Sequence, residues 1–118
     1  TLFYDSEEKR DWANEAFAEG RWADSLYHSY NVFVTSAKAL LLSEDVKNNT
    51  QIAIIRDFDR IFVEKGEFSF PEGSFEAHIT KISSNEPTEA FASTFKEEAA
   101  AFIEKVKAVR TRQLITSN

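Results

Sequence analysis

Three polar residues near the start of a long apolar stretch have types and a spacing that could support chemistry. Arg21, Asp24 and His28 step along the chain by three and then four residues, so on a helix they share one face. A histidine oriented by a carboxylate beside an arginine is an arrangement suited to RNA cleavage or phosphate binding. The simpler interpretation, which we favour, is a solvated Asp–His pair at the start of a helix.

A second cluster of charges lies further along the chain and consists of Arg56, Asp57, Asp59 and Arg60. Two arginines at this spacing could form a clamp for a phosphate or a carboxylate. The structural alternative is the solvent-facing side of a helix that is otherwise coated with Ile and Phe. We favour this second interpretation, because charges along a helix usually form a solvated face.

The remaining histidine, His78, lies between Ala77 and Ile79, where we expect an ordinary, partly exposed side chain. No Gly-rich phosphate loop, HExxH motif, calcium loop or GxSxG motif is present. The chain has no Cys, which excludes disulfides, thiolate metal sites and Cys nucleophiles. We therefore expect no catalytic residue, no metal and no cofactor. The candidate ligand-binding residues are Arg21, Asp24, His28, Arg56 and Arg60.

Helices must position these residues, and the central one is predicted over residues 21–42. This stretch has no Gly or Pro, and its apolar residues recur at the three-and-four spacing of one helical face. Gly20 suits the end of a preceding helix over 6–19, so the two should form an antiparallel hairpin. Further helices are predicted over 51–65, over 74–83 and from 88 to at least 109, followed by a frayed tail over 111–118. The predicted fold is an all-α, antiparallel up-and-down bundle of four or five helices.

Composition narrows the classes of function. The net charge of −6 argues against broad binding to nucleic acid or anionic membranes, because phosphate contacts need clustered Lys and Arg. No apolar run approaches the ~20 residues that span a bilayer, and no signal-peptide pattern opens the sequence. The 118 residues predict one domain, and the absence of Cys fits a cytoplasmic protein. A sequence that starts at Thr1 and contains no Met leads us to expect a fragment of a longer protein.

With the helices placed, the sequence resembles the HEPN domain family (higher eukaryotes and prokaryotes nucleotide-binding). Within residues 20–42, YHSY and AKALLL are similar to the long second helix of that family. The stretch NNTQIAIIRDFDRIFVEKGEF is similar to the third helix and to the FV-x-x-G turn after it, here Phe62, Val63 and Gly66. The final EEAAAFIEKVKAV resembles the closing helix, so the resemblance covers nearly the whole chain.

Many HEPN domains are dimeric ribonucleases in which an Arg, followed four to six residues later by a His, lies at the dimer cleft. This sequence departs from that pattern, since Arg56 has no His in the six positions after it and His28 follows Arg21 by seven. Many relatives also carry a His before the third helix, where residues 49–51 here read Asn-Thr-Gln. Without a correctly placed general base, metal-free RNA cleavage is not expected.

Some HEPN-like domains are appended to larger bacterial enzymes, and this sequence looks like those at the C-terminal end of nitrite/sulfite reductase-like proteins. Siroheme and iron–sulfur chemistry would then belong to the rest of the polypeptide, because cluster ligation needs Cys. The resemblance therefore implies a non-catalytic module for self-association or partner docking. It further implies a homodimer, a groove for a nucleotide, an anion or RNA, a reductase domain in the same polypeptide and no membrane partner.

Two other functions stay open at this point. A divergent ribonuclease would use Arg21 with His28, or Arg56 with His78. A small-ligand sensor would hold its ligand between the helices of the Phe-rich bundle. The Phe stripe of the last helix could line such a pocket, although helical spacing of this kind is more typical of a core. A fully packed interior would remove the sensor hypothesis.

Overall fold

The computed structural model describes residues 3–116, and every regular element in that range is helical. A π-helical turn follows the third α-helix and a 3₁₀ turn follows the fourth. The bounds are α1 Tyr4–Ala18, α2 Trp22–Leu42, α3 Gln51–Phe58 with the π turn Asp59–Val63, α4 Phe75–Ile79 with the 3₁₀ turn Thr80–Ser83, and α5 Glu89–Thr116. The prediction of an all-α helical bundle is confirmed.

α1 and α2 form a close antiparallel hairpin because small residues line the contact between them. Ala13 and Ala16 of α1 and Ser25 and Ser29 of α2 are buried. The hydroxyl of Ser25 donates a hydrogen bond of 2.9 Å to the carbonyl of Ala13. Gly20 makes the turn with a φ of 76°, a left-handed conformation that glycine adopts without strain. The predicted hairpin is therefore present.

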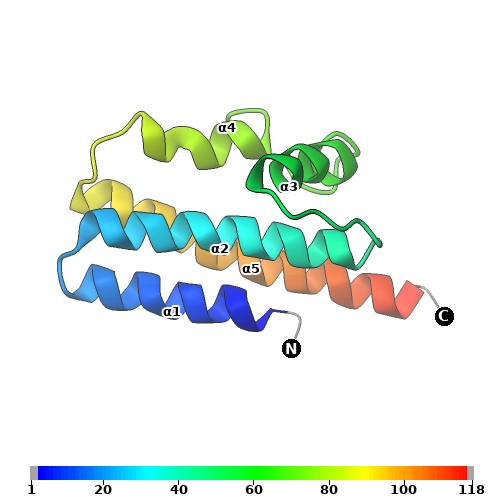
Figure 1. Cartoon of the computed structure of the whole chain (residues 1–118), viewed down its shortest axis with the longest axis horizontal. Helices are drawn as coiled ribbons and strands as arrows, with labels where there is room; N and C mark the ends of the chain where they lie inside the picture. The colour runs from blue at the N-terminus through cyan, green and yellow to red at the C-terminus, as the bar shows by residue number, and fades with distance from the viewer. Residues whose placement is uncertain (1–2, 117–118) are drawn as a thin grey trace.

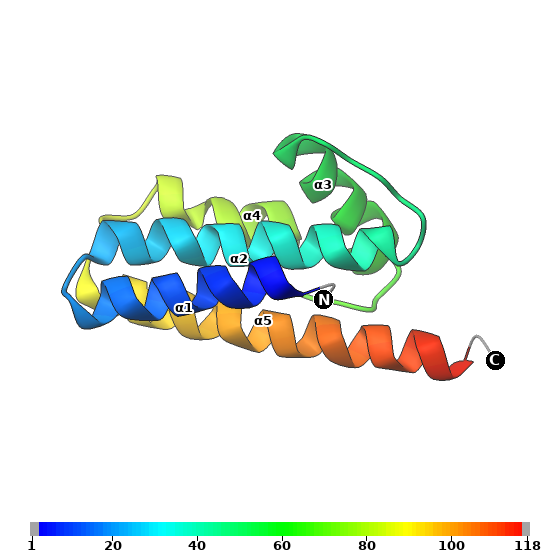
Figure 2. The same ribbon diagram turned by 60° about the horizontal axis from the view of Figure 1, so that its bottom comes forward.

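The three long helices α1, α2 and α5 pack together, and α3 and α4 lie on the side of α2 away from α1 (Figure 1, Figure 2). Chain direction reverses from α1 to α2 and again from α4 to α5, while α3 crosses the other helices (Figure 1). As a result α2 and α5 run in the same direction, and Ser43 after α2 bonds to Gln113 of α5 at 3.0 Å. α2 thus contacts α1, α3 and α5 and is the central helix.

Phenylalanine rings fill the space between α2, α5 and the α3–α4 segment. Phe33, Phe58, Phe75 and Phe95 are fully buried. The ring centroid of Phe75 lies 4.6 Å from that of Phe58 and 5.4 Å from that of Phe102. Ring pairs of this kind contribute roughly 0.5–1.5 kcal/mol each beyond their buried area. Ring packing therefore holds α3 and α4 against the long helices.

The π-helical turn after α3 anchors the start of α4. One oxygen of the Asp59 carboxylate accepts a hydrogen bond from the backbone N–H of Phe75 at 2.6 Å, and the other accepts from that of Glu76 at 3.1 Å. Ser74 adds a side-chain cap by accepting from the N–H of Ala77 at 3.0 Å. Asp59 is therefore part of a helix cap, which is a more specific role than a solvated charge.

α5 is longer than the sequence predicts. The prediction of a frayed tail over 111–118 is wrong up to Thr116, where the helix ends; residues 117 and 118 lie outside the described range. Gln113 accepts a hydrogen bond from the hydroxyl of Ser43 at 3.0 Å and donates one to the carboxylate of Glu44 at 2.9 Å. These contacts with the loop after α2 hold the last turns of α5 in place.

Candidate functional site

Arg21 lies in the turn between α1 and α2, and its guanidinium pairs with carboxylates of the same chain. Its Nε is 2.8 Å from Glu19 Oε1, and its Nη1 is 2.9 Å from Asp24 Oδ2. The hydrogen bond with Asp24, followed by that with Glu19, raises the pKa of Arg21 above its ordinary value. These carboxylates occupy N–H donors of Arg21 that a bound phosphate would otherwise use.

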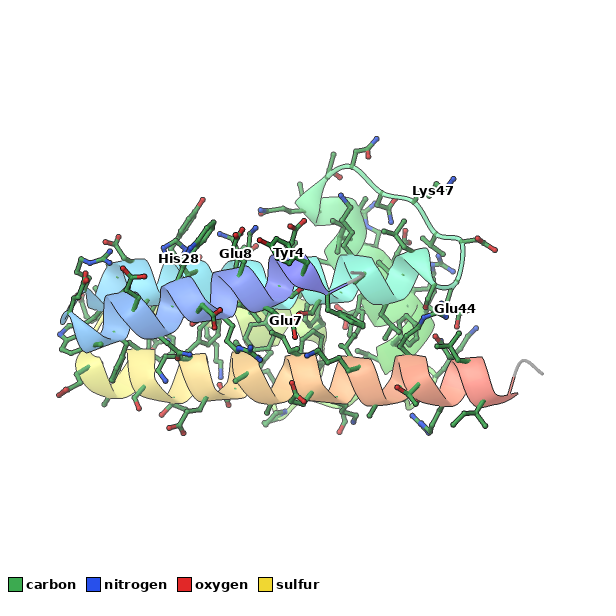
Figure 3. All side chains as sticks on the ribbon, turned by 90° about the horizontal axis from the view of Figure 1, so that it is seen from below. Tyr4, Glu7, Glu8, His28, Glu44 and Lys47 are labelled. Carbon is green, nitrogen blue, oxygen red and sulfur yellow. The ribbon has the colours of Figure 1, made fainter. Side chains whose placement is uncertain are left out.

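His28 packs between two exposed aromatic rings. Its ring centroid is 5.6 Å from that of Trp12 on α1 and 5.6 Å from that of Tyr27 on α2. Trp12 is 41% exposed and Tyr27 is 61% exposed. We call these three residues the aromatic row. Figure 3 shows the edge of the molecule on which His28 lies, with Glu8 and Tyr4 of α1 further along it.

Arg56 and Arg60 line a surface hollow of about 280 Å³ between α3, its π turn and α4. Three carboxylates line the same hollow, those of Asp59, Glu64 and Glu76. The three carboxylates therefore outnumber the two guanidinium groups, and the hollow carries a net negative charge. This arrangement is poorly suited to an anion, since an anion would face the carboxylates as well as the arginines.

The structure does not bring the group around Arg21 and His28 together with the group around Arg56 and Arg60. The hollow that contains Arg56 and Arg60 includes neither Arg21 nor His28 among its lining residues, which lie on α3, in and directly after the π turn, and on α4. The second pair considered for RNA cleavage is also separated, because Arg56 lines this hollow whereas His78 lines a different pocket.

The expectation of a partly exposed His78 is wrong, since only 4% of this residue is exposed. Its Nδ1 lies 2.7 Å from Glu72 Oε1, and the second oxygen of Glu72 lies 2.8 Å from Nζ of Lys81. The imidazole packs against Phe33 and Phe70, with centroid distances of 5.5 and 5.0 Å. Burial follows because α4 places His78 against the phenylalanine core.

Glu72 determines which nitrogen of His78 carries a proton. Burial raises the pKa of Glu72, but hydrogen bonds from Lys81 and His78 outweigh burial and lower that pKa to about 2. An ionised carboxylate can only accept hydrogen bonds, so the proton lies on Nδ1 of His78. The other nitrogen, Nε2, is 3.5 Å from Glu98 Oε1 on α5. This distance exceeds the roughly 2.7–3.2 Å of ordinary hydrogen bonds.

Nε2 and Glu98 border a pocket of about 240 Å³, which we call the His78 pocket. Most of its wall is aromatic, and the polar groups lie on α4, on α5 and in the loop before α4. The residues that define it are His78, Glu98 and Lys105 with the rings of Phe33, Phe68, Phe70 and Phe102. The rings of Phe33, Phe68 and Phe102 are at most 6% exposed, so the pocket is a hollow at the surface of the core, and the small-ligand hypothesis stays a prediction.

Sequence reasoning missed the His78 pocket because its lining comes from separate segments of the chain. Phe68 and Phe70 lie between the helices predicted over 51–65 and 74–83, and Glu98 and Lys105 lie on α5. One local signal was present: the carboxylate of Glu72, six positions before His78, lies in a turn between Pro71 and Gly73. Such a turn can bring the two side chains together.

Within residues 3–116, no group of three or more His, Cys, Asp or Glu side chains is arranged to hold a metal ion. In the same range, no helix combines the length and apolar character needed to cross a membrane. Comparison with models of known protein families, with curated proteins and with solved structures finds no match.

Proposed function

We propose that this chain is a non-catalytic, HEPN-like helical module that associates with a second copy of itself. The resemblance of its helices to the HEPN pattern, and an all-helical bundle in which α2 is central, support the first part. The exposed aromatic row supports the second part. We further expect the chain to lie in a longer cytoplasmic protein, beside a nitrite/sulfite reductase-like part.

The aromatic row is the observation that carries the self-association. Trp12 and Tyr27 are two of the most exposed large aromatic side chains in the described range, and they flank the same imidazole. Aromatic residues are enriched at the centre of protein interfaces, where burial of their rings supplies much of the binding energy. The row lies across α1 and α2, whose backbones already pack together, so no loop has to become ordered when the row is covered.

The charges around the row favour a second copy over an unrelated surface. Lys9 lies over the Trp12 ring, 5.6 Å from its centroid, and Glu8 and Asp24 are acidic neighbours on the same two helices. A two-fold axis places one patch against itself, so a patch that carries both signs can pair with its copy. The net charge of −6 repels two copies elsewhere on the surface, which favours contact at a mixed patch.

Sedimentation equilibrium of the full chain tests this proposal. We expect a dimer for the wild type and a dissociation constant that is raised by about tenfold or more for Tyr27→Ser and for Trp12→Ser, since interface aromatics are common hot spots. Ile115→Ser, at an exposed apolar position near the end of α5, is the matched control and should leave the dimer intact. A monomeric wild type at about 100 μM would contradict the proposal.

A nucleotide or anion groove has weaker support. The carboxylates of Glu19 and Asp24 would have to leave Arg21 before an anion could bind there. The same pairing of Arg21 with Glu19 and Asp24 weakens the ribonuclease alternative that uses Arg21 and His28, which leaves the one that uses Arg56. RNA incubated with the wild type and with Arg56→Ala tests that alternative, because cleavage lost in the variant would restore it.

A further inference from the structure

We propose that the His78 pocket binds a small, flat, uncharged aromatic molecule that carries one N–H or O–H donor, of the indole or phenol class. This function is separate from self-association and uses other residues. The inference rests on the shape of the pocket, on two acceptors at its polar end and on the balance of charges at its rim.

The walls of the pocket fit an aromatic ring. Phe33, Phe68, Phe70 and Phe102 line it together with the imidazole of His78. Neighbouring rings in the wall are tilted at 43–57°, as between Phe70 and Phe102 and between Phe68 and Phe102. Tilted ring surfaces offer both edge and face contacts to a further ring. An engineered apolar cavity of about 150 Å³ holds benzene, so a pocket of about 240 Å³ has room for one or two fused rings.

Two hydrogen-bond acceptors meet at the polar end of this wall. Because Nδ1 of His78 carries the proton shared with Glu72, Nε2 presents a lone pair when the ring is neutral. The carboxylate of Glu98 lies 3.5 Å from that nitrogen, with 37% of the Glu98 side chain exposed. While the ring is neutral, two acceptors this close cannot satisfy one another, and a ligand N–H or O–H placed between them can be accepted by either. A doubly protonated ring instead directs its Nε2–H toward Glu98, and the carboxylate is then the acceptor for the ligand.

The rim favours a ligand without net charge. Glu98 and Lys105 line the pocket on the same helix, seven positions apart, and bring one charge of each sign. The ammonium of Lys105 lies 4.7 Å from the ring centroid of Phe68. A ligand carboxylate would be repelled by Glu98 and attracted by Lys105, and a ligand ammonium the reverse, so the rim favours neither charge. An uncharged donor avoids both repulsions.

Titration of the ¹⁵N-labelled full chain by nuclear magnetic resonance, with indole and benzofuran as probes, tests the proposal. The two probes have nearly the same shape, but benzofuran has an oxygen where indole has its N–H. We expect indole to shift the signals of residues 68–72 and 78, and to bind about three- to tenfold more tightly than benzofuran, as expected for one hydrogen bond. Glu98→Gln should reduce that preference, because an ionised acceptor is replaced by a weaker one.

A pair of variants distinguishes indole binding in the His78 pocket from indole binding elsewhere on the surface. Ala101 lines the pocket at an exposed position of α5, so Ala101→Leu should fill the pocket and abolish the indole shifts without disturbing the core. Ala108→Leu, two turns further along the exposed side of α5, should leave them unchanged. Equal affinity for indole and benzofuran would overturn the proposal. Indole shifts that persist in Ala101→Leu, or that do not occur in the wild type at about 5 mM, would also overturn it.

Discussion

Replacement of Asp59 by Ala tests how the start of α4 is held in place. In the folded chain the two carboxylate oxygens of Asp59 accept hydrogen bonds from the backbone N–H groups of Phe75, at 2.6 Å, and Glu76, at 3.1 Å. Asp59→Ala leaves both donors without this partner. α4 has only five residues, so it cannot compensate with further bonds of its own.

The expected loss of stability follows from the burial of these two bonds. A hydrogen bond to an ionised group contributes roughly 1.5–3 kcal/mol. The bond to Phe75 is partly buried, whereas the bond to Glu76 is exposed to solvent. We therefore expect Asp59→Ala to lower the free energy of unfolding by about 2–3 kcal/mol in total. Asp59→Asn keeps one acceptor oxygen without the charge, so it should lose about half as much.

Urea denaturation followed by far-ultraviolet circular dichroism measures this effect. With a denaturant slope of about 1–3 kcal/mol/M, a loss of about 2–3 kcal/mol should lower the midpoint of Asp59→Ala by roughly 0.7–3 M. Glu64→Ala removes another carboxylate from the same surface hollow and should change stability by less than about 0.5 kcal/mol. If the two variants unfold at the same urea concentration, Asp59 does not act as a cap and the reasoning fails. Because α4 carries His78, Asp59→Ala should also weaken indole binding.

Two further predictions concern buried polar groups. Ser36 Oγ is buried without a hydrogen-bond partner among residues 3–116, so Ser36→Ala should raise the free energy of unfolding by about 1 kcal/mol. Ser25 donates a hydrogen bond to the Ala13 carbonyl, so Ser25→Ala should lower the free energy of unfolding by about 1 kcal/mol. Thermal denaturation of both variants checks the opposite signs, and two destabilised variants would contradict the first. The pKa of Glu72 falls from 4.5 to about 2 on folding, so its contribution is present above pH 4.5 and is lost as the pH falls through about 2. With a quarter of its side chain exposed, we expect Glu72→Gln to cost on the order of 2 kcal/mol at neutral pH and almost nothing near pH 2, as measured by urea denaturation across that range; a difference that does not depend on pH would contradict this.

Features that depend on residues close together in the chain could be predicted from the sequence. Gly20 ends the first helix, and the apolar stripe after it forms α2 almost residue for residue. Spacing also placed Arg21, Asp24 and His28 on one face, but the Asp24–His28 pair that it favoured is wrong, because Asp24 pairs with Arg21 and His28 packs against Trp12 and Tyr27. These outcomes follow from backbone conformation and helical periodicity, which a short stretch of sequence specifies.

The contacts between distant segments were decided only by the tertiary structure. His78 is buried because α4 packs on the phenylalanine core, and Asp59 caps a helix that begins sixteen positions later. α5 extends to Thr116 because Gln113 meets the loop after α2. The polar end of the His78 pocket forms where α4 meets α5, twenty positions along the chain from His78 to Glu98. Periodicity shows which face of a helix is apolar, but it does not show which other helix covers that face, and the partner decides which polar side chains are buried together.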